Sequence, residues 1–370
     1  MRPLTVAIST NASWNIVNFR MGLIRALQED GHRVIALAPP DVCSGRLEGM
    51  GVEYHPLEMD KKGVSPRQDL LLLARYLAAL RRIRPDVFLG YTAKPNVYGS
   101  IAAHLLGIRV VNNVSGLGTA FIDEGLLTRI VSALYRIAFH RSATVFFQNT
   151  EDRDLFLTKR LVRPDQTRLL PGSGIDLERF RPAGRAADGT FRFLLIGRLL
   201  RDKGVGEYVE AARIVRRRAQ HARFRILGFL DVANRTAVAR SDIEAWVAEG
   251  LIEYLGEADD VRPSLAEADC IVLPSYREGL PRTLLEGGAM GKPLIATDVP
   301  GCRQVVEHEM NGFLCRVRDA ASLAEAMLRM MSLPSDALAA MGAASRRKVE
   351  AEFDERLVIE SYRQAIGGSL

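Results

Sequence analysis

This chain has neither long apolar runs nor clustered cysteines, and each absence excludes a class of protein. No stretch of the 370 residues reaches the ~18 consecutive apolar residues of a transmembrane helix. The cysteines, Cys43, Cys270, Cys302 and Cys315, are scattered and form no Cys-x-x-Cys pair. We therefore expect neither a disulfide framework nor a zinc site, and we expect a reducing, cytoplasmic environment. The first apolar run has five residues, which is short for a signal peptide and predicts a strand.

A surplus of positive charge is present in only one half of the chain. Residues 1–180 contain 23 Lys and Arg against 17 Asp and Glu, whereas residues 181–370 contain 27 of each kind. The net charge of +6 therefore belongs to the first half. A basic half suits nucleic acid, an anionic membrane surface or an anionic substrate, and it can also have no binding role. Because the arginines are dispersed and no nucleic-acid motif is evident, we do not expect a nucleic-acid partner.

Strand and helix patterns alternate through both halves, and the length exceeds what one hydrophobic core usually fills. This alternation predicts an α/β protein with two doubly wound parallel sheets. Proline, glycine and polar residues cluster in residues 170–190, where we expect the boundary. The predicted domains are residues 1–178 and residues 179–352.

Residues 276–300 contain the most informative pattern, two glutamates separated by seven residues. Pro281 marks the expected start of a helix and Gly291 its end, so Glu278 lies in a loop and Glu286 on the helix. The distance from the helix start to Glu286 is roughly 8 Å along the axis. First-turn N–H groups between the two carboxylates attract a phosphate. The pattern suits a sugar nucleotide, although glutamates near a helix start are also common on ordinary surfaces.

Two cations, Arg198 and Lys203, follow the predicted strand 191–197. Cations in such a loop can neutralise a diphosphate and stabilise the charge on a departing phosphate. A solvated basic loop is the alternative interpretation for this pair taken alone.

Both segments resemble elements of a known family. The stretch EGLPRTLLE, with its tail GKPLIATDVPG, resembles the E-x7-E signature of the retaining family-4 glycosyltransferases, and GRLLRDKG resembles their G-R-x-x-x-x-K-G element. The resemblance implies the GT-B fold, in which two Rossmann-like domains face each other across a cleft. It implies an acceptor-binding first domain and a nucleotide-sugar-binding second domain. It also implies that a C-terminal helix, 353–370, packs back on the first.

The family's donor-site roles can be carried over to matching positions. The resemblance implies that Arg198 and Lys203 hold the donor diphosphate, that Glu278 contacts the sugar hydroxyls, and that Glu286 contacts the ribose. We predict Glu278, Arg198 and Lys203 as catalytic residues. The donor-binding prediction covers Arg198, Lys203, Glu278, Gly279, Leu280, Thr283, Leu284 and Glu286. Gly279 allows close backbone approach, and the N–H groups of Thr283 and Leu284 would hold the outer phosphate. The resemblance also places uracil recognition after residues 251–260.

No D-x-D motif is evident as a metal site, and in this family the two cations take the role that a metal plays in another transferase fold. We therefore expect metal-independent chemistry and no cofactor, the UDP-sugar being a substrate.

The acceptor side departs from the commonest family pattern. The loop after the first strand supplies Asn15, Asn18 and Arg20 where relatives are often glycine-rich. Ser115 and Gly116 stand where many relatives carry a histidine near the reaction centre. The resemblance then implies that the leaving phosphate accepts the acceptor's proton, with Asp123 or Glu124 as an alternative aid.

Lys94 and Asn96 complete the predicted acceptor site. They precede a predicted helix, where an anion is favoured. A solvated loop is the alternative interpretation of Lys94.

Further segments, among them SWNIVNFRMGLIRAL and YTAKPNVYGSIAA, resemble bacterial transferases that extend undecaprenyl-diphosphate-linked sugars, including N-acetylgalactosaminyltransferases. The resemblance implies a UDP-sugar donor, a lipid-diphosphate-linked sugar acceptor and an anionic membrane surface as partners. It implies a peripheral location on the inner face of the cytoplasmic membrane. Residues 126–141, with Arg129 and Arg136 on one face, suit a helix that lies on a bilayer or one that packs on its own sheet.

Three other functions fit parts of the pattern. A nucleotide-sugar epimerase of the same fold would need catalytic acids over the sugar, and only Glu278 is available. A noncatalytic nucleotide-sugar-binding partner of a polysaccharide assembly would not need the intact set of cations and carboxylates. A glycosidase pair, ~5–9.5 Å apart, is disfavoured by the phosphate-binding groups between the two glutamates.

Overall fold

The structure is a computed structural model, and it describes residues 2–60, 65–116, 125–183, 188–230, 234 and 236–367. The chain forms two compact units, which we describe separately. Unit 1 is Met1–Gly174 with Glu355–Leu370, and unit 2 is Ile175–Asp354.

The unit boundaries differ by a few residues from the predicted 178/179 and 352/353. The N–H of Ile175 donates to the carbonyl of Phe353, at 2.8 Å. Both side chains are buried in a core of unit 2. Residues 175–178 and 353–354 therefore belong to unit 2, because their apolar side chains pack there.

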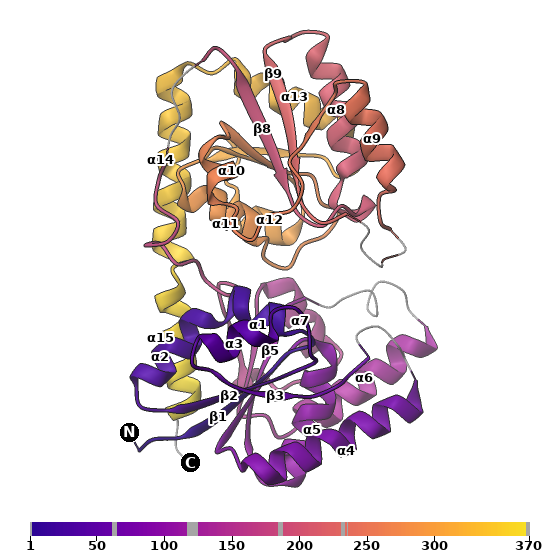
Figure 1. Ribbon diagram of the computed structural model, residues 1–370, viewed down its shortest axis with the longest axis vertical. Helices are drawn as coiled ribbons and strands as arrows, with labels where there is room; N and C mark the ends of the chain where they lie inside the picture. The colour runs from indigo at the N-terminus through magenta and orange to yellow at the C-terminus, as the bar shows by residue number, and fades with distance from the viewer. Residues whose placement is uncertain are drawn as a thin grey trace. The chain divides into compact units, whose positions relative to one another are not determined.

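Unit 1 is built on a parallel sheet whose described strands follow the order β3-β2-β1-β4-β5-β6-β7 (Figure 1). The strands are β1 (Thr5–Ser9), β2 (Arg33–Ala38), β3 (Glu53–Pro56), β4 (Val87–Tyr91), β5 (Arg109–Val114), β6 (Thr144–Phe147) and β7 (Thr167–Leu169). Its helices are α1 (Ser13–Phe19), α2 (Met21–Glu29), α3 (Ser44–Gly49), α4 (Pro66–Ile83), η1 (Pro95–Gly99), α5 (Ser100–Leu105), α6 (Leu126–Phe139), α7 (Thr150–Thr158), η3 (Pro164–Gln166) and α15 (Glu355–Gly367).

Alternation along the central strands of unit 1 gives each face of the sheet its own core. Val6 and Ile8 pack in one cluster with residues of α2 and α15. Ala7, between them, packs in another cluster with residues of α4 and α5. Because successive strand residues point to opposite faces, one apolar strand serves both helix layers.

The C-terminal helix α15 packs against α2 within unit 1. The Asn113 amide donates to the hydroxyl of Tyr362, at 2.9 Å. Arg363 donates to both carboxylate oxygens of Asp30, at 2.6 and 2.8 Å. These contacts join α15 to β5 and to the C-terminal end of α2.

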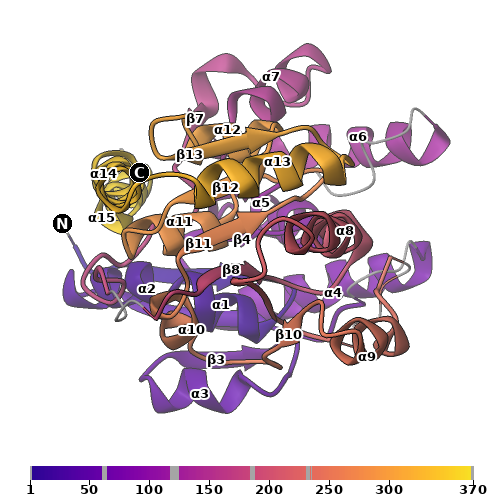
Figure 2. The same cartoon turned by 90° about the horizontal axis from the view of Figure 1, so that it is seen from above.

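Unit 2 has a second parallel sheet, whose described strands follow the order β10-β9-β8-β11-β12-β13. The strands are β8 (Phe191–Ile196), β9 (Ala222–Leu227), β10 (Glu253–Tyr254), β11 (Cys270–Leu273), β12 (Leu294–Thr297) and β13 (Gly312–Cys315). Its helices are η4 (Arg201–Lys203), α8 (Val205–Arg216), α9 (Arg240–Ala248), α10 (Arg262–Ala266), α11 (Arg282–Ala289), α12 (Pro300–Val305), α13 (Ala320–Met331) and α14 (Ser335–Glu352). Helices α8 and α13 lie side by side on one face (Figure 2).

The strand order reverses between β1 and β4 in unit 1 and between β8 and β11 in unit 2. In open parallel sheets, ligands bind outside the carboxyl ends of the strands at such a reversal. Each unit therefore has one place where its topology favours a ligand site.

Candidate functional site

The reversal point of unit 2 brings together the two segments that the sequence singled out. The loop with Arg198 and Lys203 follows β8, and the loop with Glu278 follows β11, the neighbouring strand. Gly204 allows the two loops to approach each other closely. It has a positive φ of 72°, and a Cβ there would lie 2.1 Å from the carbonyl oxygen of Pro274. Only glycine fits this position, so the Lys203 loop is held against the Glu278 loop.

Lys203 and Glu278 form an ion pair across these loops. The ammonium Nζ donates to Oε1 of Glu278, and the side chains are 23% and 12% exposed. A backbone bond from Tyr276 N–H to the carbonyl of Asp202, at 2.9 Å, supports the contact. The pair places a cation and a carboxylate within reach of one small ligand.

Arg198 differs from Lys203 in its surroundings. Its side chain is exposed, and within the part of the chain that the structure describes it makes no hydrogen bond or ion pair. A guanidinium in this state can turn toward a phosphate without breaking an internal contact.

The predicted helix after Glu278 is α11, with Pro281 as its N-cap. The hydroxyl of Thr283 donates to the carbonyl of Ile196 at the end of β8, at 3.2 Å. The N–H of Leu284 lies 3.1 Å from the carbonyl oxygen of Pro281, so that group has an internal acceptor. The N–H of Thr283 makes no backbone hydrogen bond within the described residues. Of the two predicted phosphate donors, Thr283 is the more available.

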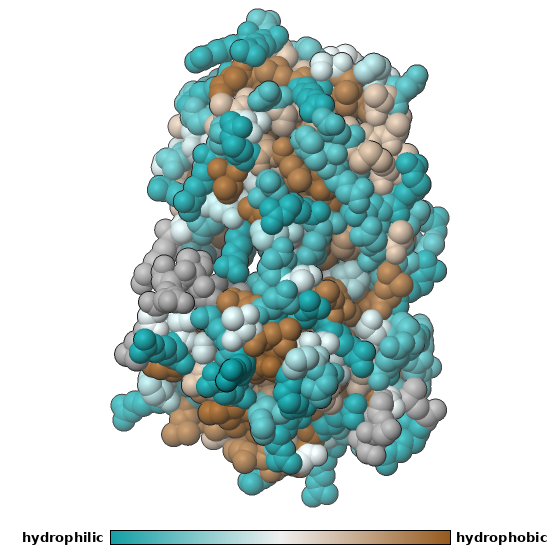
Figure 3. Space-filling model, turned by 180° about the vertical axis from the view of Figure 1, so that it is seen from behind, coloured by the Kyte–Doolittle hydropathy of each residue, from teal (hydrophilic) through white to brown (hydrophobic). Residues whose placement is uncertain are grey.

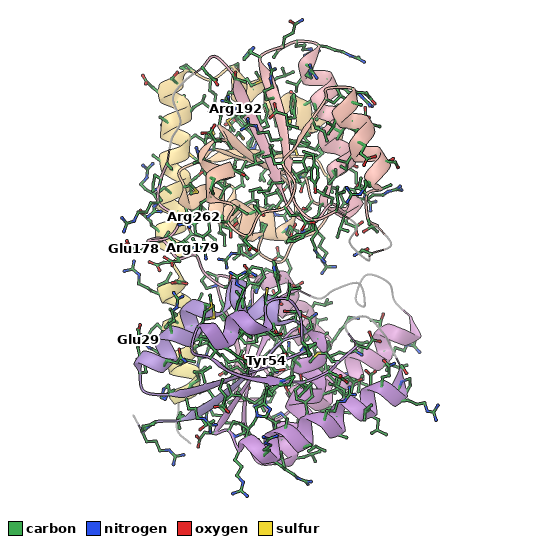
Figure 4. The ribbon with its side chains drawn as sticks, viewed as in Figure 1. Glu29, Tyr54, Glu178, Arg179, Arg192 and Arg262 are labelled. Carbon is green, nitrogen blue, oxygen red and sulfur yellow. The ribbon has the colours of Figure 1, made fainter. Side chains whose placement is uncertain are left out.

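Glu286 lies on the first turns of α11, and its Oε1 accepts from Nε of Arg282, at 2.8 Å. Burial raises the pKa of this carboxyl above its usual value, whereas the charges of Arg282 and Arg179 oppose the shift. Arg179 lies near Arg262, which donates to its carbonyl oxygen at 3.3 Å (Figure 4). The carboxylate is therefore held on the helix by a cation rather than pointing freely into solvent.

The loop that includes Gly279 and Leu280 packs tightly against the start of α12. A Cβ on Gly301 would lie 2.2 Å from the carbonyl oxygen of Gly279 and 2.7 Å from that of Glu278. Gly279 and Leu280 are both partly exposed. The absence of a side chain at Gly301 therefore lets α12 pack against this loop. The sequence analysis did not predict this role, although Gly301 belongs to the VPG tail of the matching segment.

Tyr276 is a second residue that the sequence interpretation missed. Its hydroxyl donates to Oε1 of Glu207, at 2.6 Å, and the guanidinium of Arg318 lies 4.6 Å from the ring centroid. Burial and the bond to Glu207 raise the pKa of Tyr276 to about 12. No spacing in the sequence indicated this cluster, because its members come from three separate segments.

The sequence placed Asn15, Asn18 and Arg20 in a loop after the first strand, but the structure forms a helix there: Asn15 and Asn18 lie in α1 and Arg20 follows its last residue. Arg20 is only 5% exposed, and its guanidinium carbon lies 4.1 Å from the ring centroid of Tyr91. Within the described structure, Nε of Arg20 and Oδ1 of Asn15 are buried without a hydrogen-bond partner. Asn18 donates to the carbonyl of Trp14, at 2.8 Å. Arg20 and Asn15 therefore keep unused hydrogen-bonding capacity.

Lys94 and Asn96 are already engaged inside unit 1. Lys94 donates to Asp69 at 2.8 Å, with side chains 16% and 12% exposed. Asn96 is 1% exposed. Its amide donates to the carbonyl of Asn113 and accepts from the amide of Asn112, both at 2.9 Å. The structure gives Asn96 a packing role.

The remaining predicted acceptor residues, Ser115 and Gly116, follow β5 and are exposed. The alternative acids, Asp123 and Glu124, lie outside the described residues.

The described residues contain no group of three or more His, Cys, Asp or Glu side chains arranged to hold a metal ion. Among the same residues, no helix has both the length and the apolar character that crossing a bilayer requires.

Comparison with known proteins assigns both units to one class. Residues 16–172 match the family model "Glycosyl transferase 4-like domain", and residues 190–332 match "Glycosyl transferases group 1". The chain is 24% identical to the N,N'-diacetylbacillosaminyl-diphospho-undecaprenol alpha-1,3-N-acetylgalactosaminyltransferase of Campylobacter jejuni, over 97% of each chain. It is 26% identical to the UDP-Gal:alpha-D-GlcNAc-diphosphoundecaprenol alpha-1,3-galactosyltransferase of Escherichia coli, over 73% of this chain and 72% of that one.

The fold has close solved counterparts. The structure of Anabaena HepE in complex with UDP and glucose matches with a TM-score of 0.81 at 16% identity, covering 99% of this chain and 100% of that chain. Two Rossmann-like units of this kind constitute the GT-B fold, which the sequence resemblance predicted.

Proposed function

Because the chain belongs to the family-4 glycosyltransferases and has their GT-B fold, we propose that it transfers a sugar from a UDP-sugar to an undecaprenyl-diphosphate-linked saccharide, with retention of configuration. The names of the two relatives support this acceptor class. The name of the Campylobacter relative also supports N-acetylgalactosamine, or another N-acetylhexosamine, as the first donor sugar to test. The product would enter surface polysaccharide or glycoprotein glycan assembly at the inner face of the cytoplasmic membrane.

The observation that carries the proposal is the Lys203–Glu278 ion pair beside the start of α11 at the reversal point of unit 2. In the proposed complex, a diphosphate would accept from the Lys203 ammonium and from the Thr283 N–H. Lys203 has three donors, so it can bind a phosphate oxygen while it still contacts Glu278. Arg198 is free to add a bidentate contact.

In the proposed reaction, the bond between the sugar C1 and the β-phosphate oxygen breaks, and a bond from the acceptor hydroxyl oxygen to C1 forms on the same face. The acceptor's proton passes to the departing phosphate, and UDP leaves. Lys203 and Arg198 stabilise the charge that builds on the phosphate, a contribution that is realised mainly in the transition state. Glu278 orients the sugar through its hydroxyls, and Glu286 holds the ribose.

We assign the acceptor to unit 1, where Nε of Arg20, unpartnered among the described residues, can donate to a lipid diphosphate and the likewise unpartnered Oδ1 of Asn15 can accept from a sugar hydroxyl. Lys94 also has three donors, so its ammonium can add a contact to the acceptor while it still donates to Asp69. The surplus of positive charge in residues 1–180 supports contact with an anionic membrane surface.

The test is a transfer assay with purified protein, a panel of UDP-sugars and a synthetic lipid-diphosphate sugar, with product identified by mass and by anomeric NMR signals. We expect one N-acetylhexosamine to be added with an α linkage from an α-linked donor. A β-linked product would overturn retention. Binding of UDP without any transfer across the panel would favour a noncatalytic partner instead.

A further inference from the structure

A second concave site lies in unit 1, at the amino ends of its strands. The cavity has a volume of roughly 790 Å³ and is lined by the ends of α4 and α5, by residues next to β4 and β5, and by Arg141 after α6. It is rich in arginine, with Arg81, Arg84, Arg109 and Arg141 among its lining residues. The predicted acceptor residues lie at the carboxyl ends of the same sheet, so this cavity is a separate place.

The positive charge of the cavity is not balanced by its own residues. Among the described residues that line it, Asp86 is the one acidic residue. That carboxylate already accepts from Thr5 N–H, at 2.8 Å, and from Arg2, at 3.2 Å. Within the described residues, the exposed side chains of Arg81 and Arg141 form no ion pair.

Arg84 occupies a backbone conformation that is costly for its residue type. It caps α4 in the left-handed region, with φ 52° and ψ 56°, and Pro85 follows it. Glycine is the usual residue at such a cap, and a following proline disfavours compact conformations of the residue before it. A functional use of the guanidinium would explain an arginine at this position.

Two other lining residues, Arg109 and His104, are held in place by hydrogen bonds within unit 1. Arg109 donates to the carbonyl of Ala365 in α15, at 3.1 Å from Nη2. Nε2 of His104 lies 2.9 Å from the carbonyl oxygen of Ala138, which can only accept, so this nitrogen carries the proton. Burial lowers the pKa of His104, and the charge of Arg141 lowers it further. The pocket is therefore preformed around its arginines.

We propose that this cavity binds a phosphate-bearing anion, at a site separate from the nucleotide-sugar site of unit 2. Several guanidinium groups around one pocket match the geometry and charge of phosphate oxygens. The same chemistry can come from a phospholipid headgroup or from a dissolved phosphate compound. Leu105, next to the lining residues, is 67% exposed. Figure 3 shows hydrophobic residues interspersed with hydrophilic ones on the face turned away from Figure 1. The inference does not depend on the proposed transferase activity.

The test maps the site directly, because a soluble anion would also enter the donor site. Arginine reactivity toward phenylglyoxal is measured by mass spectrometry on the full chain, alone, with inorganic pyrophosphate, and with vesicles of phosphatidylglycerol and phosphatidylcholine. Vesicles of phosphatidylcholine alone serve as a blank. We expect at least tenfold slower modification of Arg81 and Arg141 with one anionic probe. Arg217 and Arg218, which are exposed in unit 2, should slow by less than twofold.

Protection by pyrophosphate identifies a dissolved phosphate compound as the ligand class, and protection only by phosphatidylglycerol vesicles identifies a lipid headgroup. The R81Q/R141Q variant should bind the effective probe at this site at least tenfold more weakly, as reported by Arg84 protection, whereas R217Q/R218Q should not change it. The proposal would be overturned if both probes slowed the modification of Arg81 and Arg141 no more than that of Arg217 and Arg218. It would also be overturned if both double variants weakened probe binding equally.

Discussion

Lys203 donates to the carboxylate of Glu278 across two loops that follow neighbouring strands, β8 and β11. The two residues are separated by 75 positions in the chain, and the topology of the sheet brings them together. A cation and a carboxylate in one contact can each bind a different part of a sugar nucleotide, the diphosphate and the sugar. Their separate removal is therefore the most direct test of the donor site.

Replacing Lys203 or Glu278 by alanine should lower kcat/KM for transfer by about 10²–10³-fold, because each variant removes a group that acts on developing charge or on sugar orientation. Each variant also leaves its partner partly buried and unpaired, at a cost of ~1–3 kcal/mol. The transfer assay is therefore paired with urea unfolding to establish that the variant is folded. Arg217→Ala, which removes an exposed cation elsewhere in unit 2, is the control. Near-normal turnover by either site variant would refute the donor-site assignment.

Replacing Gly301 by alanine should weaken UDP binding at least tenfold, because the new Cβ would press on the carbonyl oxygens of Gly279 and Glu278. The variant should also lose about 1–3 kcal/mol of stability, the usual cost of overpacking. Calorimetric titration with UDP and thermal unfolding measure the two effects. Gly206→Ala is the matched control, since a Cβ there meets nothing within 4 Å and alanine favours its helix by ~0.5–1 kcal/mol. Equal UDP affinity in both variants would show that the loop does not need this support.

The buried carboxyl of Glu286 should make unit 2 less stable as pH rises. Its pKa in the folded state is raised above the usual 4.5, so the folded state binds the proton more tightly than the unfolded state. The resulting stabilisation is complete below pH 4.5 and is lost as pH rises through the higher folded value. The stability of Glu286→Gln relative to the wild-type chain should therefore improve from pH 4.5 to pH 7, in urea unfolding at each pH. Glu325→Gln, at an exposed position of α13, should show no such trend. A relative stability of Glu286→Gln that falls over the same range would contradict this account.

The pair between Arg363 and Asp30 should stabilise the packing of α15 on α2 at neutral pH. The bond to Arg363 lowers the pKa of Asp30 below its usual 3.8, so this contribution is present above that value and is lost as pH falls through the lower folded value. Both side chains are about one-third exposed, and Arg363→Gln should cost only ~0.2–1 kcal/mol at pH 7. Arg25→Gln, on the solvent side of α2, is the control for urea unfolding. A larger loss at pH 3 than at pH 7 would exclude the mechanism.

Transfer should not require a divalent metal, because Arg198 and Lys203 can neutralise the diphosphate themselves. We expect activity in 5–10 mM EDTA to be unchanged within about twofold, a difference equivalent to only ~0.4 kcal/mol in the barrier. The assay is repeated with added magnesium or manganese after chelation. Loss of activity in EDTA followed by recovery with either ion would show that the cations do not suffice.

The order of the elements and the donor segment could be predicted from local patterns. The strand 191–197 was visible as an apolar run, and Pro281 and Gly291 marked the helix that the structure has as α11. Residues near each other in the chain impose these features through periodicity and capping. The helix α1, with only 7 residues, escaped prediction, and the sequence placed Asn15 and Asn18 in a loop.

The pairing of partners was decided only by the tertiary structure. Nothing in the sequence showed that Lys203 contacts Glu278, that Gly301 supports their loop, or that Asp69 neutralises Lys94. The sequence placed Asn96 in an anion site, whereas the fold buries it among Asn112 and Asn113. The sequence by itself determined the residue types at the site, the two-domain α/β order and the basic first half. Folding decides which of those charged side chains remain available to a ligand. A charged side chain that becomes buried needs a partner of opposite charge, and at these positions the partner is distant in the sequence.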